Sequence, residues 1–348
     1  MVSVSKSNQI LLKNFDSHLS LANSISFKKN NLLVTLGCNK ILLLDYDKLA
    51  ILKQMGNLGL SETLFREPVY GMYDSEIYIC DWHNNRIVIF DEEFNYTSEI
   101  GSSGYSVRTT NILTLMLRVV KYIVKMSFKG SYFKSHFQSQ INSKVKTSRI
   151  YSYSLRLGLN NILYLYRKFG LNFILNKLSG DCNTLHKPNG VAKHKKFLFI
   201  TEKNKKCVTF FSKAGSKFTM KKRFNRIRNY KFGRLGNIKV IENYLVICDE
   251  MGKRIFFYNL QNKQFFTIED KFDKDFQPFT ICKIKKSLLV TGGKNHFYLI
   301  DLNSKKLLCK NKINGEIHGL ESKFDSRGFL LLDRLNSKIN EYIVNYNE

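Results

Sequence analysis

Acidic side chains recur at one position of this chain, each directly after a short apolar run. They are Asp81, Glu202, Asp249 and Asp333. Converging carboxylates bind hard cations, whereas a carboxylate that returns once per repeat is typical of an acceptor that ties a turn through local hydrogen bonds. The regular recurrence favours the second role. We therefore predict that these residues stabilise turns: Asp81, Asn84, Arg86, Glu202, Asp249 and Asp333.

The acids mark an internal repeat of two apolar strands around a short polar turn. The clearest copy joins residues 77–80 and 87–90. The other copies surround Leu36, Glu202, Asp249, Gly292 and Asp333. The steps between successive turn positions are 45, 121, 47, 43 and 41 residues. Four steps match the length of a four-stranded propeller blade, and the long step contains one blade plus an insertion. The predicted fold class is all-β, a six-bladed β-propeller with a basic α-helical insertion between blades two and three.

The two ends of the chain complement each other. The last copy stops at its third strand, and residues 9–15 form an apolar strand with no blade of its own. We expect this strand to become the outer strand of blade six, because a closed ring leaves no exposed edge. The expected organisation is 1–104 for blades one and two with the closing strand, 105–180 for the insertion, and 181–348 for blades three to six.

The clearest copy resembles the NHL repeat, in which an apolar strand, Asp, a short turn and Asn-x-Arg precede an apolar strand that ends near Asp and Gly. Asp81, Asn84, Arg86 and Asp91 match this pattern, and Pro-Asn-Gly-Val-Ala at 188–192 matches its beginning. The resemblance is strongest in blade two and weakest in blades one, five and six. It implies a six-bladed NHL-like propeller and does not imply an activity.

A ligand of such a propeller is expected at the end of the central channel, where the innermost strands begin. The axial candidates are Asn23, Tyr70, Asn189, Asn237, Thr280 and His318. Asn189 resembles an axial asparagine of six-bladed lactonase-type hydrolases, which hold a divalent cation with Asn, Asp and Glu. Only Glu67 and Glu316 lie close to any candidate, however, and hard cations prefer several carboxylate oxygens.

Catalytic residues, a metal site and cofactors are not predicted. The seven histidines fall at unrelated repeat positions, which argues against zinc. The alternative hypothesis is a metal-dependent hydrolase or lyase that acts on a sugar or lactone, with a divalent cation at the axis. The seven cysteines lack the spacing of metal ligands and fit small buried hydrophobes in a reducing compartment.

The insertion concentrates positive charge. Residues 102–180 contain 13 Lys and Arg and no Asp or Glu, in a chain of net charge +28. Between 111 and 128 the polar residues recur at steps of three and four, which indicates an amphipathic helix, and a second helical region spans about 148–178. We predict that anions or membranes are bound by Arg118, Lys121, Lys125, Arg156, Arg167 and Lys168.

Three roles fit this insertion. It is a solvated hairpin on the propeller, an interfacial element whose basic residues reach anionic lipid, or an RNA-binding element whose tyrosines stack on bases. Its long apolar runs favour a lipid surface or a protein groove over RNA. No apolar run reaches the about 18 residues of a spanning helix, and no secretory signal is evident.

The leading hypothesis is a non-catalytic scaffold in the cytoplasm, and the anionic-membrane alternative places it at the inner face of the membrane as a peripheral protein. Its expected partner is an acidic protein or an anionic membrane surface. A positive charge excess of this size favours an anionic partner of either kind.

Overall fold

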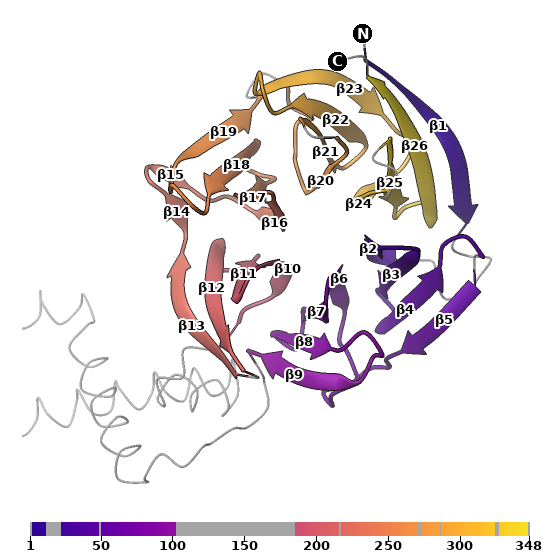
Figure 1. Cartoon of the computed structure of the whole chain (residues 1–348), viewed down its shortest axis with the longest axis vertical. Helices are drawn as coiled ribbons and strands as arrows, with labels where there is room; N and C mark the ends of the chain where they lie inside the picture. The colour runs from indigo at the N-terminus through magenta and orange to yellow at the C-terminus, as the bar shows by residue number, and fades with distance from the viewer. Residues whose placement is uncertain are drawn as a thin grey trace, which may run out of the picture. The chain divides into compact units, whose positions relative to one another are not determined.

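The computed structural model describes residues 2–11, 22–48, 50–101, 185–215, 217–270, 273–285, 287–323 and 327–346. Within these residues, six four-stranded antiparallel sheets follow one another around a ring (Figure 1). The prediction of an all-β, six-bladed propeller is thus confirmed. The helical insertion predicted at 105–180 lies outside the described residues, together with the six basic residues assigned to it. No helix in the described ranges has the length and apolar content needed to cross a bilayer.

Each blade is a meander of four strands, numbered here from the innermost strand outward. Blade one contains β2 (Ala22–Lys28), β3 (Asn31–Leu36), β4 (Lys40–Asp45) and β5 (Ala50–Met55). Blade two contains β6 (Pro68–Tyr73), β7 (Ile77–Asp81), β8 (Arg86–Phe90) and β9 (Tyr96–Ile100). Blade three contains β10 (Pro188–His194), β11 (Phe197–Glu202), β12 (Cys207–Ala214) and β13 (Lys217–Phe224).

The second half of the chain continues the pattern. Blade four contains β16 (Leu235–Ile241), β17 (Tyr244–Asp249), β18 (Arg254–Asn259) and β19 (Phe265–Glu269). Blade five contains β20 (Thr280–Lys283), β21 (Leu288–Gly293), β22 (His296–Asp301) and β23 (Lys306–Lys312). Blade six contains β24 (Ile317–Ser322), β25 (Gly328–Asp333), β26 (Lys338–Tyr346) and β1 (Val2–Leu11). A small ribbon of β14 (Arg226–Ile227) and β15 (Tyr230–Lys231) joins blades three and four.

The core lies between neighbouring blades. Strands β7 and β8 are buried at every residue, because one face packs on blade one and the other on blade three. A strand buried on both faces reads as a continuous apolar run, which is why the middle strands were the clearest signal in the sequence. The outer strand β5 is exposed over most of its length.

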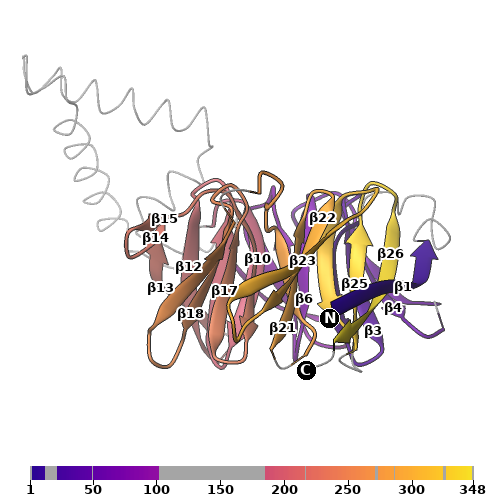
Figure 2. The ribbon, with the colours of Figure 1, turned by 90° about the horizontal axis from the view of Figure 1, so that it is seen from above.

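The ring closes through β1, which pairs antiparallel with β26 from Val2–Tyr346 to Leu11–Lys338. The two chain ends lie close together in both views (Figures 1 and 2). The predicted closing strand was 9–15, and the observed strand begins seven residues earlier, at Val2. Residues 12–15 of the prediction lie outside the described residues. Residues 3–9 are mostly polar and exposed, so this outer strand is held by backbone pairing and needs no apolar run.

Candidate functional site

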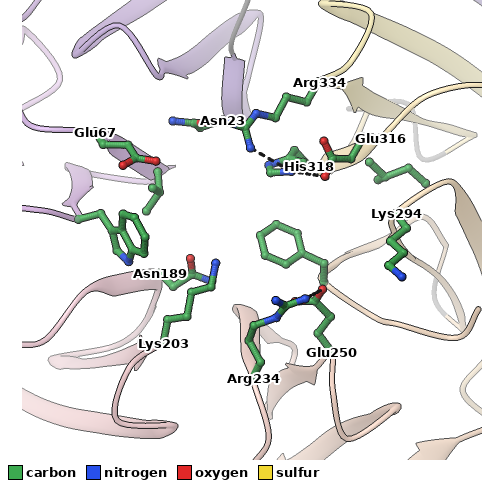
Figure 3. A pocket seen from close by; sticks show the side chains of 14 residues that line it. Asn23, Glu67, Asn189, Lys203, Arg234, Glu250, Lys294, Glu316, His318 and Arg334 are labelled. Carbon is green, nitrogen blue, oxygen red and sulfur yellow. Dashed lines mark hydrogen bonds and ion pairs between the residues drawn. The ribbon is translucent and has the colours of Figure 1, made fainter.

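The innermost strands begin with a break in register that turns side chains toward the axis. In β2, β6, β10 and β24 the pairing with the next strand skips one residue, and the skipped residues are Asn23, Val69, Asn189 and His318. An unpaired residue of this kind re-aims its side chain. All four line a cavity of about 230 Å³ at the axis, which Figure 3 shows from close by.

Three of the axial candidates therefore lie in this cavity, namely Asn23, Asn189 and His318. The side-chain amides of the two asparagines also link neighbouring blades. Asn23 Nδ2 donates to the Pro68 carbonyl oxygen at 3.0 Å, and Asn189 Nδ2 donates to the Leu235 carbonyl oxygen at 3.1 Å. Each bond joins one blade to the next.

The other three candidates, Tyr70, Asn237 and Thr280, are buried and do not line the cavity. Asn237 Nδ2 donates to Thr280 Oγ1 at 3.1 Å, and burial raises the pKa of Tyr70 well above its usual value. The register accounts for the position of Tyr70. Tyr70 lies one residue beyond the skipped position in β6, and a shift of one residue moves a side chain to the opposite face of the strand.

Most of the charged lining was missed by sequence reasoning. It comes from residues that directly follow the second strand of a blade or directly precede the first. The first group contains Trp82, Lys203, Glu250, Lys294 and Arg334, and the second contains Glu67, Arg234 and Glu316. A signal was present, because Trp82, Lys203, Glu250 and Arg334 each follow one of the recurring acids by one position.

The two groups are paired by the backbone. The amide N–H groups of Trp82, Glu250 and Arg334 donate to the carbonyl oxygens of Glu67, Arg234 and Glu316 at 3.2, 2.9 and 2.8 Å. The N–H group of Lys203 donates in the same way to the Lys187 carbonyl oxygen at 3.1 Å. Each backbone hydrogen bond thus ties the residue after the second strand of a blade to the residue before its first strand, at the edge of the cavity that we call its mouth.

The recurring acids hold these segments in place. Asp81 is fully buried and accepts hydrogen bonds from the Arg66 N–H at 2.7 Å, Asn84 Nδ2 at 2.7 Å and Arg86 Nε at 2.9 Å. Burial raises the pKa of Asp81, although Arg86 and the hydrogen bonds oppose the shift.

The other three acids make equivalent contacts with the segment before the innermost strand. Glu202 accepts from the His186 N–H at 2.7 Å, Asp249 from the Gly233 N–H at 3.1 Å, and Asp333 from the Glu316 N–H at 3.0 Å. The turn acids therefore bind the segments that border the cavity, and none of the four lines it.

The carboxylates of the cavity are already engaged. Glu250 forms a two-point ion pair with Arg234 through Nε, at 2.7 Å, and Nη2. Glu316 lies 3.3 Å from His318 Nε2, which lowers the pKa of Glu316. Glu67 lies 2.9 Å from the His83 imidazole.

Two lysines of the cavity remain uncompensated. Among the described residues, no carboxylate lies within ion-pair distance of the Lys203 or Lys294 ammonium group. Burial and the charge of Arg234 lower the pKa of Lys203, although Glu250 and Glu67 oppose the shift. The surroundings of Lys203 therefore disfavour its positive charge, which an anion would relieve, and Lys294 lies across the cavity from it (Figure 3).

The Trp82 side chain lies beside two lysines, Lys187 and Lys203. The Lys187 ammonium is 4.0 Å from the centre of the Trp82 ring, and the Lys203 ammonium is 5.4 Å from it. The indole Nε1 is buried, and the described residues offer it no hydrogen-bond acceptor. A buried donor without a partner is costly, so the site favours a ligand with acceptor oxygens.

The arrangement does not fit a hard cation. Such an ion needs several converging oxygens, but Glu67, Glu250 and Glu316 are each directed at a basic side chain. The parts of the chain that the structure describes contain no cluster of three or more His, Cys, Asp or Glu side chains suited to a metal.

An ion pair crosses the channel farther along the axis. Lys239 Nζ of β16 lies 2.6 Å from Glu321 Oε1 of β24, with side chains 16% and 14% exposed. The two strands belong to blades four and six, which are not neighbours. The pair therefore links two blades that are not adjacent in the ring.

Comparisons with known proteins establish the fold and leave the family open. The sequence matches no family model, so the resemblance to NHL repeats is not confirmed, and no curated protein matches it. A solved structure described as the crystal structure of RRP9 WD40 repeats has a TM-score of 0.56 and 6% identity, covering 99% of this chain and 100% of that one. At this identity the likeness shows shape alone, and the chain is therefore identified as a six-bladed β-propeller.

Proposed function

We propose that this chain is a non-catalytic binding propeller that holds an anionic partner at its axial cavity. One observation carries the proposal, namely the disfavoured positive charge of Lys203 beside the Trp82 indole N–H, which has no hydrogen-bond partner among the described residues, with Lys294 across the same cavity. Perturbed pKa values cluster at functional sites, and a buried donor without a partner is explained by a bound ligand, ion or water. A carboxylate-bearing segment of an acidic protein has the charge and the acceptor oxygens that this site requires.

Binding is favoured over hydrolysis because of how the acids are used. A general acid, a general base or a metal ligand needs a carboxylate directed at substrate or ion. The three glutamates of the cavity instead contact the side chains of Arg234, His318 and His83. We therefore prefer a binding role to the metal-dependent hydrolase or lyase hypothesis.

The basic insertion extends the same proposal. Its 13 Lys and Arg residues without a single acid would add long-range attraction for an acidic protein or an anionic membrane. The proposed contacts are those assigned from the sequence, Arg118, Lys121, Lys125, Arg156, Arg167 and Lys168. Flotation with anionic vesicles tests the membrane contact, and equal recovery of the full chain and a chain lacking 105–180 would refute it.

The axial site is tested with a fluorescent oligoglutamate peptide and anisotropy. Replacing Lys203 and Lys294 by glutamine is expected to weaken binding about fivefold at low salt, because two partly exposed charge contacts together contribute about 1 kcal/mol. The matched control replaces Lys306 and Lys312, which are exposed in blade five outside the cavity.

Equal affinity of the axial variant and the unaltered chain would contradict the axial site. Tighter binding of a single-stranded RNA than of the peptide, with a steep loss of affinity as salt increases, would favour nucleic-acid binding instead.

A further inference from the structure

A second hollow, of about 600 Å³, lies between blades three and four and shares no lining residue with the axial cavity. Its walls come from blade three, from blade four and from the ribbon of β14 and β15. Figure 1 shows this ribbon at the outer rim between β13 and β19. We refer to the hollow as the rim groove.

Aromatic side chains form the floor of the rim groove. They are Phe197, Phe199, Phe210, Phe224, Tyr258 and Phe265. Side chains alternate along a strand, so Phe210 of β12 faces blade four while the next residue, Phe211, packs toward blade two. All but Phe199 are only partly buried, which leaves a contiguous apolar surface at the protein exterior. Such a surface typically marks an interaction site.

Every charged side chain at the rim of the groove is basic. Lys195, Lys222, Arg226, Arg228 and Lys263 are exposed around it, and no Asp or Glu lines it. In the described parts of the chain, none of these five side chains has an ion-pair partner. The rim charge therefore remains available to an incoming ligand.

We propose that the rim groove binds an acidic peptide segment of a partner protein, with a Phe, Trp or Leu side chain inserted between the phenylalanines and flanking Asp or Glu residues on the rim. A groove of this volume accommodates bulky anchors, and buried aromatic or aliphatic anchors dominate the affinity of such contacts. The carboxylates complement the rim and fix the orientation.

Two other occupants fit the groove less well. The insertion of this chain carries 13 basic residues and no acid over 102–180, so the rim repels it. Single-stranded nucleic acid needs free ring faces on which its bases stack. Here the rings of Phe199 and Phe210 stack on each other at 5.1 Å and 12°, and the Arg228 guanidinium lies 4.9 Å from the centre of Phe265.

Selection of peptides tests the proposal without knowledge of the partner. A random peptide library displayed on phage is selected against the full-length chain and, in parallel, against a chain carrying Lys222→Glu and Arg226→Glu. Both residues are exposed, so the substitutions leave the fold intact, and melting curves verify this. We expect the unaltered chain to enrich peptides that combine a bulky apolar residue with Asp or Glu, and the variant to lose them. No enrichment, or the same peptides from both chains, would overturn the proposal.

Affinity measurements on the best peptide then locate the site. The Lys222→Glu, Arg226→Glu chain is expected to bind about tenfold more weakly, because each reversal replaces an attraction with a repulsion. The Lys306→Glu, Lys312→Glu control and the axial Lys203→Gln, Lys294→Gln chain should bind as the unaltered chain does. Changing the apolar anchor of the peptide to Ala should also abolish binding.

Two outcomes would count against the groove and leave the axial proposal standing. The first is a peptide whose affinity falls only in the axial variant. The second is displacement of the peptide by oligodeoxythymidine at a lower concentration than the unlabelled peptide requires, which would assign the groove to nucleic acid.

Discussion

Lys203 is expected to lower the stability of the fold that contains it. Its ammonium group is half-buried beside Arg234 and has no ion-pair partner among the described residues. Replacing it by glutamine removes that charge and retains most of the side chain. We therefore predict that Lys203→Gln is more stable than the unaltered chain, although it binds the oligoglutamate probe more weakly.

The size of the effect is modest. Solvent screens a partly exposed cation, so the gain should be about 0.5–1 kcal/mol, in the range found when unfavourable charges are removed. For a protein of this size the melting temperature should increase by about 1–4 °C.

The sign of the pH dependence follows from the lowered pKa of Lys203. The folded chain releases this proton at a lower pH than the unfolded chain, whose lysine has a pKa near 10.5. The unaltered chain should therefore become more stable relative to the variant as pH increases toward 10.5.

Urea unfolding followed by tryptophan fluorescence and circular dichroism measures the difference, with Lys239→Gln as the control. Lys239 is compensated by Glu321 at 2.6 Å, and both side chains are mostly buried. Removing this lysine leaves Glu321 without its cation and should cost about 3 kcal/mol. The two lysine substitutions are thus expected to change stability in opposite directions. A loss of stability in Lys203→Gln comparable with that in Lys239→Gln would refute the electrostatic account of the cavity.

Three further predictions concern the fold. Asp81→Ala removes the acceptor of three hydrogen bonds and leaves the buried Arg86 short of one carboxylate, so urea unfolding should show a loss of about 3–5 kcal/mol. Deleting residues 2–11 leaves the edge of blade six unpaired, and size-exclusion chromatography should show concentration-dependent association. Gly236→Ala places a Cβ against the Phe279 carbonyl oxygen, and thermal melting should show a loss of about 1–3 kcal/mol. A stable, monomeric truncated chain, or full stability of either substituted chain, would contradict the corresponding contact.

The blades could be predicted because the signals that define them are local. The second strands of blades two, three and four are mostly apolar runs of four or five residues that each end on a turn acid. Strand pairing within a meander joins neighbours in sequence, so spacing alone indicates where one blade ends. The outer strand β1 was displaced in the prediction because its polar, exposed residues carry no such signal.

The site was predicted only in part because it depends on register. Asn23, Asn189 and His318 occupy skipped positions at the start of their strands, whereas Tyr70 lies one residue farther along. Nothing in the local sequence distinguishes a skipped residue from its neighbour. If the register break is placed one residue too far along the strand, a side chain of the core is assigned to the cavity in error.

The sequence by itself determined that this protein is built from repeated sheets, since apolar runs and turn acids act within a few residues of one another. Only the tertiary structure decided which charges lack a partner. Lys203 is uncompensated and Lys239 is neutralised because of distances between blades that are far apart in the chain. The rim groove likewise exists only where blades three and four meet, since its phenylalanines are indistinguishable in sequence from those of an ordinary core. Packing between blades is a long-range property, and it determines which of these side chains line the axial cavity and the rim groove.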